Sequence, residues 1–548
     1  MKGKKTKWVV LALIFAGGLL QSASIKGVNL IPPYNSLDLL NAKNVPPLTV
    51  DHSKIKALQK HFATGPDVTK ACLQCHSQAA KQVMHTYHWT WLTKDKDGHY
   101  RGKGFFINNF CISILSNEPR CTSCHAGYGW KDKNFDFKNE NNVDCLVCHD
   151  QTGKYKKFPA GAGHPVYKPK VFLGKKWLPP DLSYIAQHVG LPGRKNCGAC
   201  HFYGGGGDNV KHGDLSSDLL NPTKDIDVHM DAKGLNFSCT KCHTTHQHMV
   251  AGRYYERSAE IEHRLALPKP TKNMLGCENC HGTRPHKSRI LNNHTNKVAC
   301  QTCHIPYFAK KRKTNVWWDW STAGKFDAQG HKIHKHDSEG YPIYKTEKGT
   351  LVWKRMVKPI YMWYNGNFQY GYIGEKIDSL RIKVNVGDSV VEAVYINKPL
   401  GSPNDPNSKI YPFKAHFSKQ PYDPVQNILV IPHLFGPKGS GAFWADFDWQ
   451  KAIETGMKYA GLPWSGKYGF IKTVQFYTIS HQVSPKEKAL KCADCHAKNG
   501  RLAYVQGIYM PGRDRFKLIE ILGWLAVFAT LVGVVIHGGI RLFSKKGE

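Results

Sequence analysis

The chain has 548 residues, of which 41% are hydrophobic, and 76 basic against 41 acidic residues give it a formal net charge of +35. Such a surplus is typical of nucleic-acid-binding proteins, but the sequence holds no nucleic-acid-binding motif, so we expect no nucleic acid as a partner. Two explanations of the charge stay open: compensation of acidic groups on bound cofactors, and attraction of small anionic substrates.

The first 24 residues predict a signal peptide. The basic start MKGKKTK precedes the apolar run WVVLALIFAGGLL, and small residues follow up to a cleavage point at Ser24. An uncleaved anchor is the alternative. In both cases we expect export to the periplasm or the outer face of the cytoplasmic membrane.

Eight copies of Cys-x-x-Cys-His follow, and only Cys111 among the 17 cysteines lies outside them. A single Cys-x-x-Cys could bind zinc or form a redox pair. Eight copies, each followed by His, predict eight covalently bound haem c groups, with iron ligated by the motif histidine. The attachment residues are Cys72, Cys75, Cys121, Cys124, Cys145, Cys148, Cys197, Cys200, Cys239, Cys242, Cys277, Cys280, Cys300, Cys303, Cys492 and Cys495, and the motif histidines are His76, His125, His149, His201, His243, His281, His304 and His496.

Motif spacing suggests how the exported chain is divided. The first seven motifs lie too close together for separate domains, so residues 25–305 are expected to form one heptahaem body with neighbouring haems. Residues 306–480 are expected to form an aromatic-rich, β-containing insertion, and 481–511 the eighth-haem segment. The predicted fold class is a multihaem cytochrome c, mainly short α-helices and loops around eight haems, with that insertion and one C-terminal transmembrane helix.

The insertion carries the clearest strand pattern. Apolar residues alternate from Leu380 to Val386, Gly387 and Asp388 supply a turn, and Val391 to Ile396 predicts the returning strand. The aromatic clusters WWDW at 317–320 and YMWY at 361–364 are interpreted as core.

Residues 512–548 predict a C-terminal membrane anchor. The run from Ile521 to Ile540 has no charged residue and is long enough to cross about 30 Å of hydrocarbon as a helix. Because haem attachment takes place outside the cytoplasm, we expect a single-pass protein with a cytoplasmic C-terminus. His537 lies in this run, and we interpret it as an interfacial residue; contact with quinol or a partner's haem b is the alternative.

Second iron ligands are expected among the remaining histidines, because low-potential haems are commonly ligated by two imidazoles. The candidates are His61, His88, His229, His248, His286, His294 and His481. His61 and His481 each lie the same distance before a motif, which suggests delivery of a ligand by the segment that enters a haem site.

Two features suggest a reactive site. Cys111 is a lone thiol shortly before the second motif, with an inert buried cysteine as the alternative. After the fourth motif, four glycines at 204–207 permit close approach of the backbone to a flat cofactor, and Lys211 follows.

These segments resemble the octahaem tetrathionate reductase family: NFC at 109–111, NEPRCTSCHAGYGW at 117–130, NVDCLVCHD at 142–150 and CGACHF with its glycine loop. The resemblance covers about Ile55 to Met510. It implies that one haem, attached by an ordinary motif, has a lysine as iron ligand and is the active site. We transfer this role to the haem on Cys121 and Cys124, with Lys211 as ligand and Lys156 and Lys157 as reserves, and place Cys111 beside the substrate.

The resulting hypothesis is a membrane-anchored periplasmic reductase of tetrathionate, or of nitrite or hydroxylamine, at a lysine-ligated haem fed by the other seven. Expected partners are a small anionic substrate, the membrane, quinol or a cytochrome b subunit, and redox proteins. The alternative is a non-catalytic electron conduit between the quinol pool and other carriers.

Overall fold

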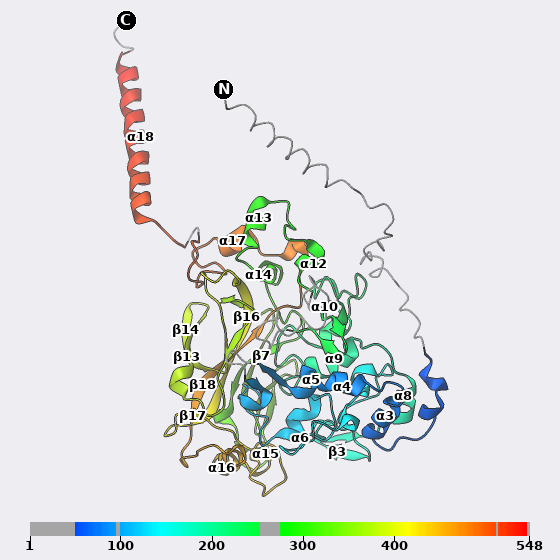
Figure 1. Cartoon of the computed structure of the whole chain (residues 1–548). Helices are drawn as coiled ribbons and strands as arrows, with labels where there is room; N and C mark the ends of the chain where they lie inside the picture. Colours follow the sequence, from blue (N-terminus) through cyan, green and yellow to red (C-terminus); the bar gives the residue numbers. More distant parts are fainter. Residues whose placement is uncertain (1–49, 95–98, 253–274, 511–512, 545–548) are drawn as a thin grey trace, which may run out of the picture. The chain divides into compact units, whose positions relative to one another are not determined.

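The computed structural model describes residues 50–94, 99–252, 275–510 and 513–544 (Figure 1). The predicted signal peptide lies outside the described residues. Up to the seventh motif the chain forms mostly short helices. They are α3 (Gly65–Cys72), α4 (Ala79–Met84), α5 (Tyr87–Thr90), α6 (Glu118–Cys121), α7 (Leu146–His149), α8 (Leu182–Gln187), α9 (Arg194–His201), α10 (Cys239–Cys242), α12 (Glu278–His281), α13 (Arg289–His294) and α14 (Cys300–His304).

Short 3-10 turns and two-stranded ribbons connect these helices. The turns are η1 (His52–Lys54), η2 (Lys56–Leu58), η3 (Lys103–Phe105), η4 (Thr122–Cys124), η5 (Glu140–Asn142) and η6 (Ser217–Leu220). The ribbons are β1 (Leu92–Lys94) with β2 (Tyr100–Gly102), β3 (Lys170–Phe172) with β4 (Lys175–Trp177), and β5 (Thr245–His246) with β6 (Met249–Val250).

Haem attachment motifs coincide with helical turns. One turn of helix places residues i and i+3 on one face, so a helical Cys-x-x-Cys presents both thiols to the same side. The first motif is entered by α3, whose start is fixed by a capping box: Asp67 N donates to Thr64 Oγ1, and Thr64 N donates to Asp67 Oδ2.

A ten-stranded sheet dominates residues 314–478. Its strand order is β13-β14-β18-β16-β7-β10-β9-β8, and β11 and β17 pair with β16. The strands are β7 (Thr314–Asp319), β8 (His334–His336), β9 (Pro342–Lys345), β10 (Gly349–Lys354), β11 (Ile360–Tyr364), β13 (Arg381–Val386), β14 (Ser389–Tyr395), β16 (Lys409–Asp423), β17 (Ile428–Leu429) and β18 (Gly469–Thr478), and β12 (Phe368–Tyr370) pairs separately with β15 (Asn397–Pro399). The remaining elements are η8 (Trp320–Thr322), η9 (Ile377–Leu380), α15 (Phe443–Asp446), α16 (Trp449–Ala460), η10 (Lys486–Lys488), α17 (Cys492–Cys495) and α18 (Lys517–Ser544).

The predicted hairpin is confirmed. Strands β13 and β14 pair antiparallel with Val386 opposite Ser389, so Gly387 and Asp388 form the turn. The strands start at different residues from those expected: Leu380 belongs to η9, and β14 begins two residues earlier.

The fold class needs a correction, because the sheet is far larger than an insertion among helices and loops. The sequence pattern did not predict its central strand, β16. One face of β16 buries Lys414, His416, Ser418 and Gln420, so polar residues stand where an ordinary strand has its apolar face.

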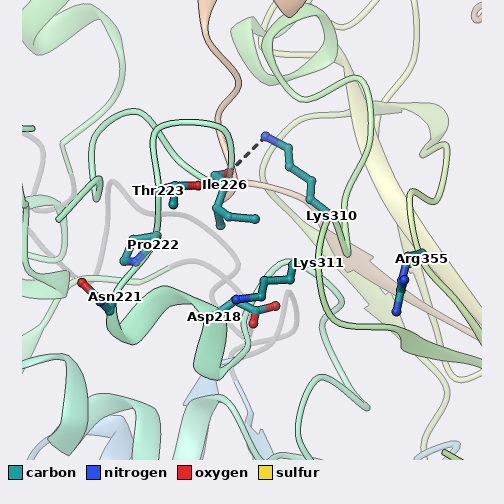
Figure 2. Close-up of a pocket in the computed structure, with 8 residues that line it drawn as sticks. All are labelled: Asp218, Asn221, Pro222, Thr223, Ile226, Lys310, Lys311 and Arg355. Carbon is teal, nitrogen blue, oxygen red and sulfur yellow. Dashed lines mark hydrogen bonds between the residues drawn. The ribbon is translucent and has the colours of Figure 1, made fainter. Parts of the chain in front are cut away.

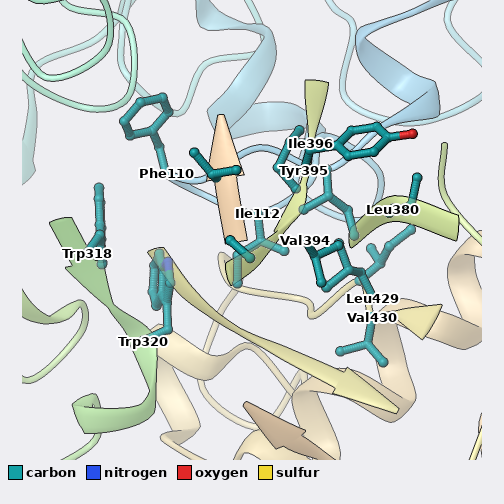
Figure 3. Packing of buried hydrophobic residues seen from close by; sticks show 14 of the residues in the cluster. Phe110, Ile112, Trp318, Trp320, Leu380, Val394, Tyr395, Ile396, Leu429 and Val430 are labelled. Carbon is teal, nitrogen blue, oxygen red and sulfur yellow. The ribbon is translucent and has the colours of Figure 1, made fainter. Parts of the chain in front are cut away.

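The main hydrophobic cluster packs the sheet against the segment that holds Cys111 (Figure 3). Phe110 and Ile112 are buried on either side of Cys111, and the Phe110 ring centroid lies 6.3 Å from that of Trp318. Trp318 and Trp320 are buried and stack at 4.9 Å, which confirms that the first aromatic cluster is core. The sheet therefore fixes the position of the lone cysteine.

The helix α18 includes the predicted membrane run. It has 28 residues with a mean hydropathy of 2.3 in its most apolar window, and none of that window is buried. By length and composition it is a candidate membrane span.

Candidate functional site: eight haem motifs and a distinct second motif

Seven motif histidines each face a second histidine ring. An imidazole nitrogen binds a transition metal at about 2 Å, so two rings on opposite sides of one iron have centroids about 6 Å apart. The structure shows that spacing throughout: His76–His52 6.3 Å, His149–His248 6.3 Å, His201–His88 6.2 Å, His243–His481 6.1 Å, His281–His229 6.0 Å, His304–His286 6.1 Å and His496–His294 6.0 Å. Each pair accompanies two attachment cysteines, so the donor set fits haem c with two imidazole ligands.

Six of the seven histidines chosen from the sequence lie in these pairs: His88, His229, His248, His286, His294 and His481. The choice of His61 differs from the structure, where His52 faces His76. Phe62 is buried and takes the inward side of this segment, which leaves its neighbour His61 exposed. His52 lies in η1, whose N-cap Asp51 accepts a hydrogen bond from Ser53 N.

Cysteines of different motifs lie side by side. In four pairs a thiol of one motif lowers the pKa of a thiol of another, which places the two close together: Cys145 acts on Cys72, Cys200 on Cys124, Cys197 on Cys239 and Cys277 on Cys300. Weaker electrostatic effects on the pKa relate Cys148 to Cys197, Cys242 to Cys280 and Cys303 to Cys495, so these pairs are also near each other. Together these neighbouring pairs connect all eight motifs in one series, and the second motif is connected to it through the fourth.

The second motif has a different backbone from the other seven. His125 N donates to Thr122 O at 2.8 Å in the 3-10 turn η4, and His125 itself is extended, with φ −67° and ψ 143°. In the other motifs the histidine either belongs to an α-helix or donates its N–H to the carbonyl of the first cysteine, as His76 does to Cys72 at 2.9 Å. The tighter turn directs His125 away from the path that the other motif histidines follow.

The ring of His125 is fully buried in an aromatic box. Its Nε2 lies 2.6 Å from the carbonyl oxygen of Trp89. Because a carbonyl only accepts, Nε2 must carry the proton and has no lone pair for iron. Burial lowers the pKa of His125 to about 3, so the ring is neutral. The box consists of Trp89, Trp91, Trp130, Phe135 and Phe137, with centroids 4.8 to 6.2 Å from the imidazole. Among the described residues, no second histidine faces His125 at the spacing of the other pairs.

Lys211 lies beside the second motif. Its side chain is half-buried, and its charge interacts with Cys124 and Lys103. Burial, followed by the positive charge of Lys103, lowers the pKa of Lys211 to about 7. The glycine loop makes room for this side chain, because a Cβ at Gly204 would lie 3.2 Å from Lys211 Cδ.

A buried lysine of the sheet holds the Lys211 backbone. Lys414 Nζ donates to Val210 O at 2.7 Å, Lys211 O at 3.0 Å and Thr314 Oγ1 at 2.7 Å. Sequence reasoning missed this contact, because Lys414 is remote in the chain and on the polar face of β16.

The reserve lysines have other surroundings. Lys156 is exposed. Lys157 is buried and pairs with Asp144 Oδ2 at 3.1 Å, while its Nζ also donates to His125 O. Lys157 is therefore committed to the backbone beside the second motif.

Cys111 is near the same motif and has two cations in its electrostatic environment. Its thiol lies within electrostatic range of Cys121, Lys348 and Arg120. Burial raises the pKa of Cys111, and both cations oppose that rise. Lys103, with Nζ 4.0 Å from the Trp91 ring centroid, adds a positive charge near Cys121 and Cys124. Arg120 directly precedes Cys121, whereas Lys348 comes from a distant segment of the sheet. The sequence analysis assigned none of the three cations a role, because no local pattern distinguishes them from surface charges.

A separate cavity of about 320 Å³ is lined by none of the residues of the second motif, nor by Cys111 or Lys211 (Figure 2). Lys310 on its wall donates to Asp225 O and Ile226 O, and to Ser484 Oγ. Its ammonium is thus held by the fold. The cavity is lined by Asp218, Asn221, Pro222, Thr223, Ile226, Lys310, Lys311 and Arg355.

Paired imidazoles beside paired cysteines define a multihaem c-type cytochrome, and comparisons with known proteins agree. The "Cytochrome c bacterial" family matches residues 315–499. The crystal structure of an octahaem cytochrome c from Shewanella oneidensis is 44% identical, with a TM-score of 0.71 over 84% of this chain and 97% of that chain. An uncharacterised protein of Archaeoglobus fulgidus is 25% identical over 242 residues, 36% of this chain and 80% of its own length. The chain belongs to the octahaem cytochrome c family.

Proposed function

We propose that this octahaem cytochrome is a reductase of a small anionic substrate, with the reaction at the second haem and Lys211 as its iron ligand. One observation carries the proposal: His125 is withdrawn into an aromatic box while the other seven motif histidines face a second imidazole. A chain whose haems all have two tight ligands only transfers electrons, whereas an enzyme needs one haem with an exchangeable position.

The chemistry of Lys211 suits this role. An amine binds a metal only when it is neutral, and an exposed lysine is almost fully charged at neutral pH. Burial and Lys103 lower the pKa of Lys211 to about 7, which makes the neutral amine available. Bound haem would supply electrons and a Lewis-acidic iron at this position.

The cations around Cys111 favour an anionic substrate. Lys103, Arg120 and Lys348 lie near Cys111 or the second motif, and the net charge of +35 adds a long-range attraction. Tetrathionate fits this setting as a dianion. Its central S–S bond accepts two electrons and breaks to give two thiosulfate dianions, a reaction that needs no proton.

The role of Cys111, which is half-buried, follows from the protonation state of its thiol. A raised pKa keeps the group as a thiol at neutral pH, so it is not preset as a thiolate nucleophile. We assign Cys111 to contact with the substrate rather than to attack on the S–S bond. Nitrite and hydroxylamine are smaller candidates for the same position.

We further propose that α18 anchors the protein to the cytoplasmic membrane, with the haem body outside. Haem attachment outside the cytoplasm and the apolar length of α18 support this placement. A quinol-oxidising membrane partner would then supply electrons through the linked motifs. If every haem were saturated, the chain would be an electron conduit instead.

Turnover with a reduced viologen dye tests the proposal. Purified protein should oxidise the dye with tetrathionate, nitrite or hydroxylamine, and Lys211→Ala should abolish that turnover while Lys156→Ala keeps it. Absence of turnover with all three substrates, together with eight bis-imidazole haem signals, would establish the conduit.

A further inference from the structure

Lys157 and Asp144 form a buried ion pair between the second and third motifs. Their side chains are 7% and 0% exposed, and Lys157 Nζ lies 3.1 Å from Asp144 Oδ2. Three further donors satisfy the Asp144 carboxylate: Tyr128 OH at 2.7 Å, Tyr155 OH at 2.9 Å and Val147 N at 3.1 Å. These donors hold the Asp144 carboxylate in a fixed position, and the carboxylate in turn fixes the position of the Lys157 ammonium.

That ammonium also holds the second motif. Lys157 Nζ donates to the carbonyl of His125 and lies 3.5 Å from Gly127 O. The adjoining backbone is held on both sides, because Ala126 N donates to His88 O at 3.2 Å and Asp144 N donates to Ala126 O at 2.9 Å. The main chain of His125 is thus clamped next to the ring contact with Trp89 O.

We propose that the Lys157–Asp144 pair is a positioning device that keeps His125 off the second haem iron and so reserves the iron for Lys211. This inference rests on the proposed function for the identity of the ligand that takes the place of His125.

A clamp is needed because His125 directly follows the attachment residue Cys124. A ligand tethered so closely to its haem competes at a high effective concentration, as the other seven motif histidines illustrate. Lys211 reaches the same haem from a distant segment and has no such advantage. Only contacts that oppose the return of His125 can reverse this preference, and the backbone clamp and the Trp89 carbonyl are those contacts.

The test removes the clamp and records the haem signals of the holoprotein. The double variant Lys157→Met/Asp144→Asn leaves no buried charge unpaired. In electron paramagnetic resonance, one of the eight haem signals is expected to change to that of a haem with an imidazole ligand from His125. Adding His125→Phe should restore the original signal, because phenylalanine stays in the aromatic box and cannot bind iron. Lys157→Arg should keep the original signal, and Lys156→Met is the exposed control.

A milder variant provides the same test if the double variant fails to fold. In Lys157→Gln the amide can still donate to Asp144 but is too short to hold the His125 carbonyl as well, so the same signal change is expected. An unchanged spectrum in a variant that retains eight haems per chain would overturn the clamp. If Lys211→Ala leaves the native signal intact while Lys157→Gln changes it, the clamp stands and the lysine ligand falls. If His125→Phe alone abolishes the native signal, His125 is the ligand and both proposals fall.

Discussion

The Nε2 atom of His125 lies 2.6 Å from the carbonyl oxygen of Trp89, a contact that takes up the ring nitrogen with which motif histidines bind iron. The other seven motif histidines lie 6.0 to 6.3 Å, centroid to centroid, from a second imidazole. The eight sites of this chain are therefore not equivalent, although their five-residue motifs are alike.

The structure favours one of two nearby histidines as the second ligand of the first haem. His52 faces His76, whereas His61 is exposed. We expect His52→Ala to remove one bis-imidazole signal from the oxidised protein and His61→Ala to leave all signals unchanged. Electron paramagnetic resonance of the two variants, measured at equal haem content, decides between them; the reverse result would restore His61 as the ligand.

Lys414 is expected to stabilise the loop that carries Lys211. Replacement by Met removes three hydrogen bonds and leaves the buried carbonyls of Val210 and Lys211 without this donor, at a cost of about 1–3 kcal/mol in the free energy of unfolding. Thermal unfolding measures the loss, and Lys419→Met on the same strand is the control. Equal stability of the two variants would contradict the assigned role.

Glu118 gives the protein a pH-dependent stability. Burial raises the pKa of Glu118, and Tyr459 OH donates to its Oε1 at 2.9 Å. A raised folded-state pKa means that its contribution to stability is complete below the unfolded pKa of about 4.3 and is lost as pH rises through the folded value. The difference in Tm between Glu118→Gln and the parent protein should therefore be more favourable to the variant at pH 8 than at pH 4. A difference independent of pH would contradict the shift.

Lys348 is expected to bind the anionic substrate. Its ammonium interacts electrostatically with Cys111. Loss of one charge-assisted contact with the substrate costs about 1.5–3 kcal/mol, or about a 10- to 100-fold loss in kcat/KM. Lys348→Met should show this loss with tetrathionate and a smaller one with uncharged hydroxylamine. Lys335→Met, a change at an exposed lysine of β8, is the control. Equal losses with both substrates would show that the charge of Lys348 is not used in recognition.

Removal of α18 tests the anchor. A chain that ends after Arg515 should appear in the soluble fraction of the periplasm with eight haems attached, while the full chain resists a carbonate wash of membranes. Release of the full chain by the wash would show that α18 does not span the bilayer.

Features determined by residues close together in the chain could be predicted from the sequence, whereas features that depend on remote contacts could not. Haem attachment, the hairpin at 381–395 and the burial of Trp318 follow from residues close together in the chain. The size of the sheet was not predictable, because β16 buries Lys414 and His416 where the apolar pattern would be read. The choice of His52 over His61 depends on which side of one segment Phe62 occupies.

The candidate site shows the same division. Cys111 and Lys211 stood out as a lone thiol and a lysine after a glycine loop, and the structure places both near the second motif. The clamp by Lys157 and the cations Lys103 and Lys348 depend on contacts between distant segments, which no local pattern records.

The most direct test of the account is electron paramagnetic resonance of the oxidised protein with Lys211→Ala and His125→Phe compared side by side. We predict seven bis-imidazole haems and one distinct haem in the parent protein, loss of the distinct signal in Lys211→Ala, and its retention in His125→Phe. An eighth bis-imidazole signal in the parent, or loss of the distinct signal in His125→Phe alone, would contradict the account.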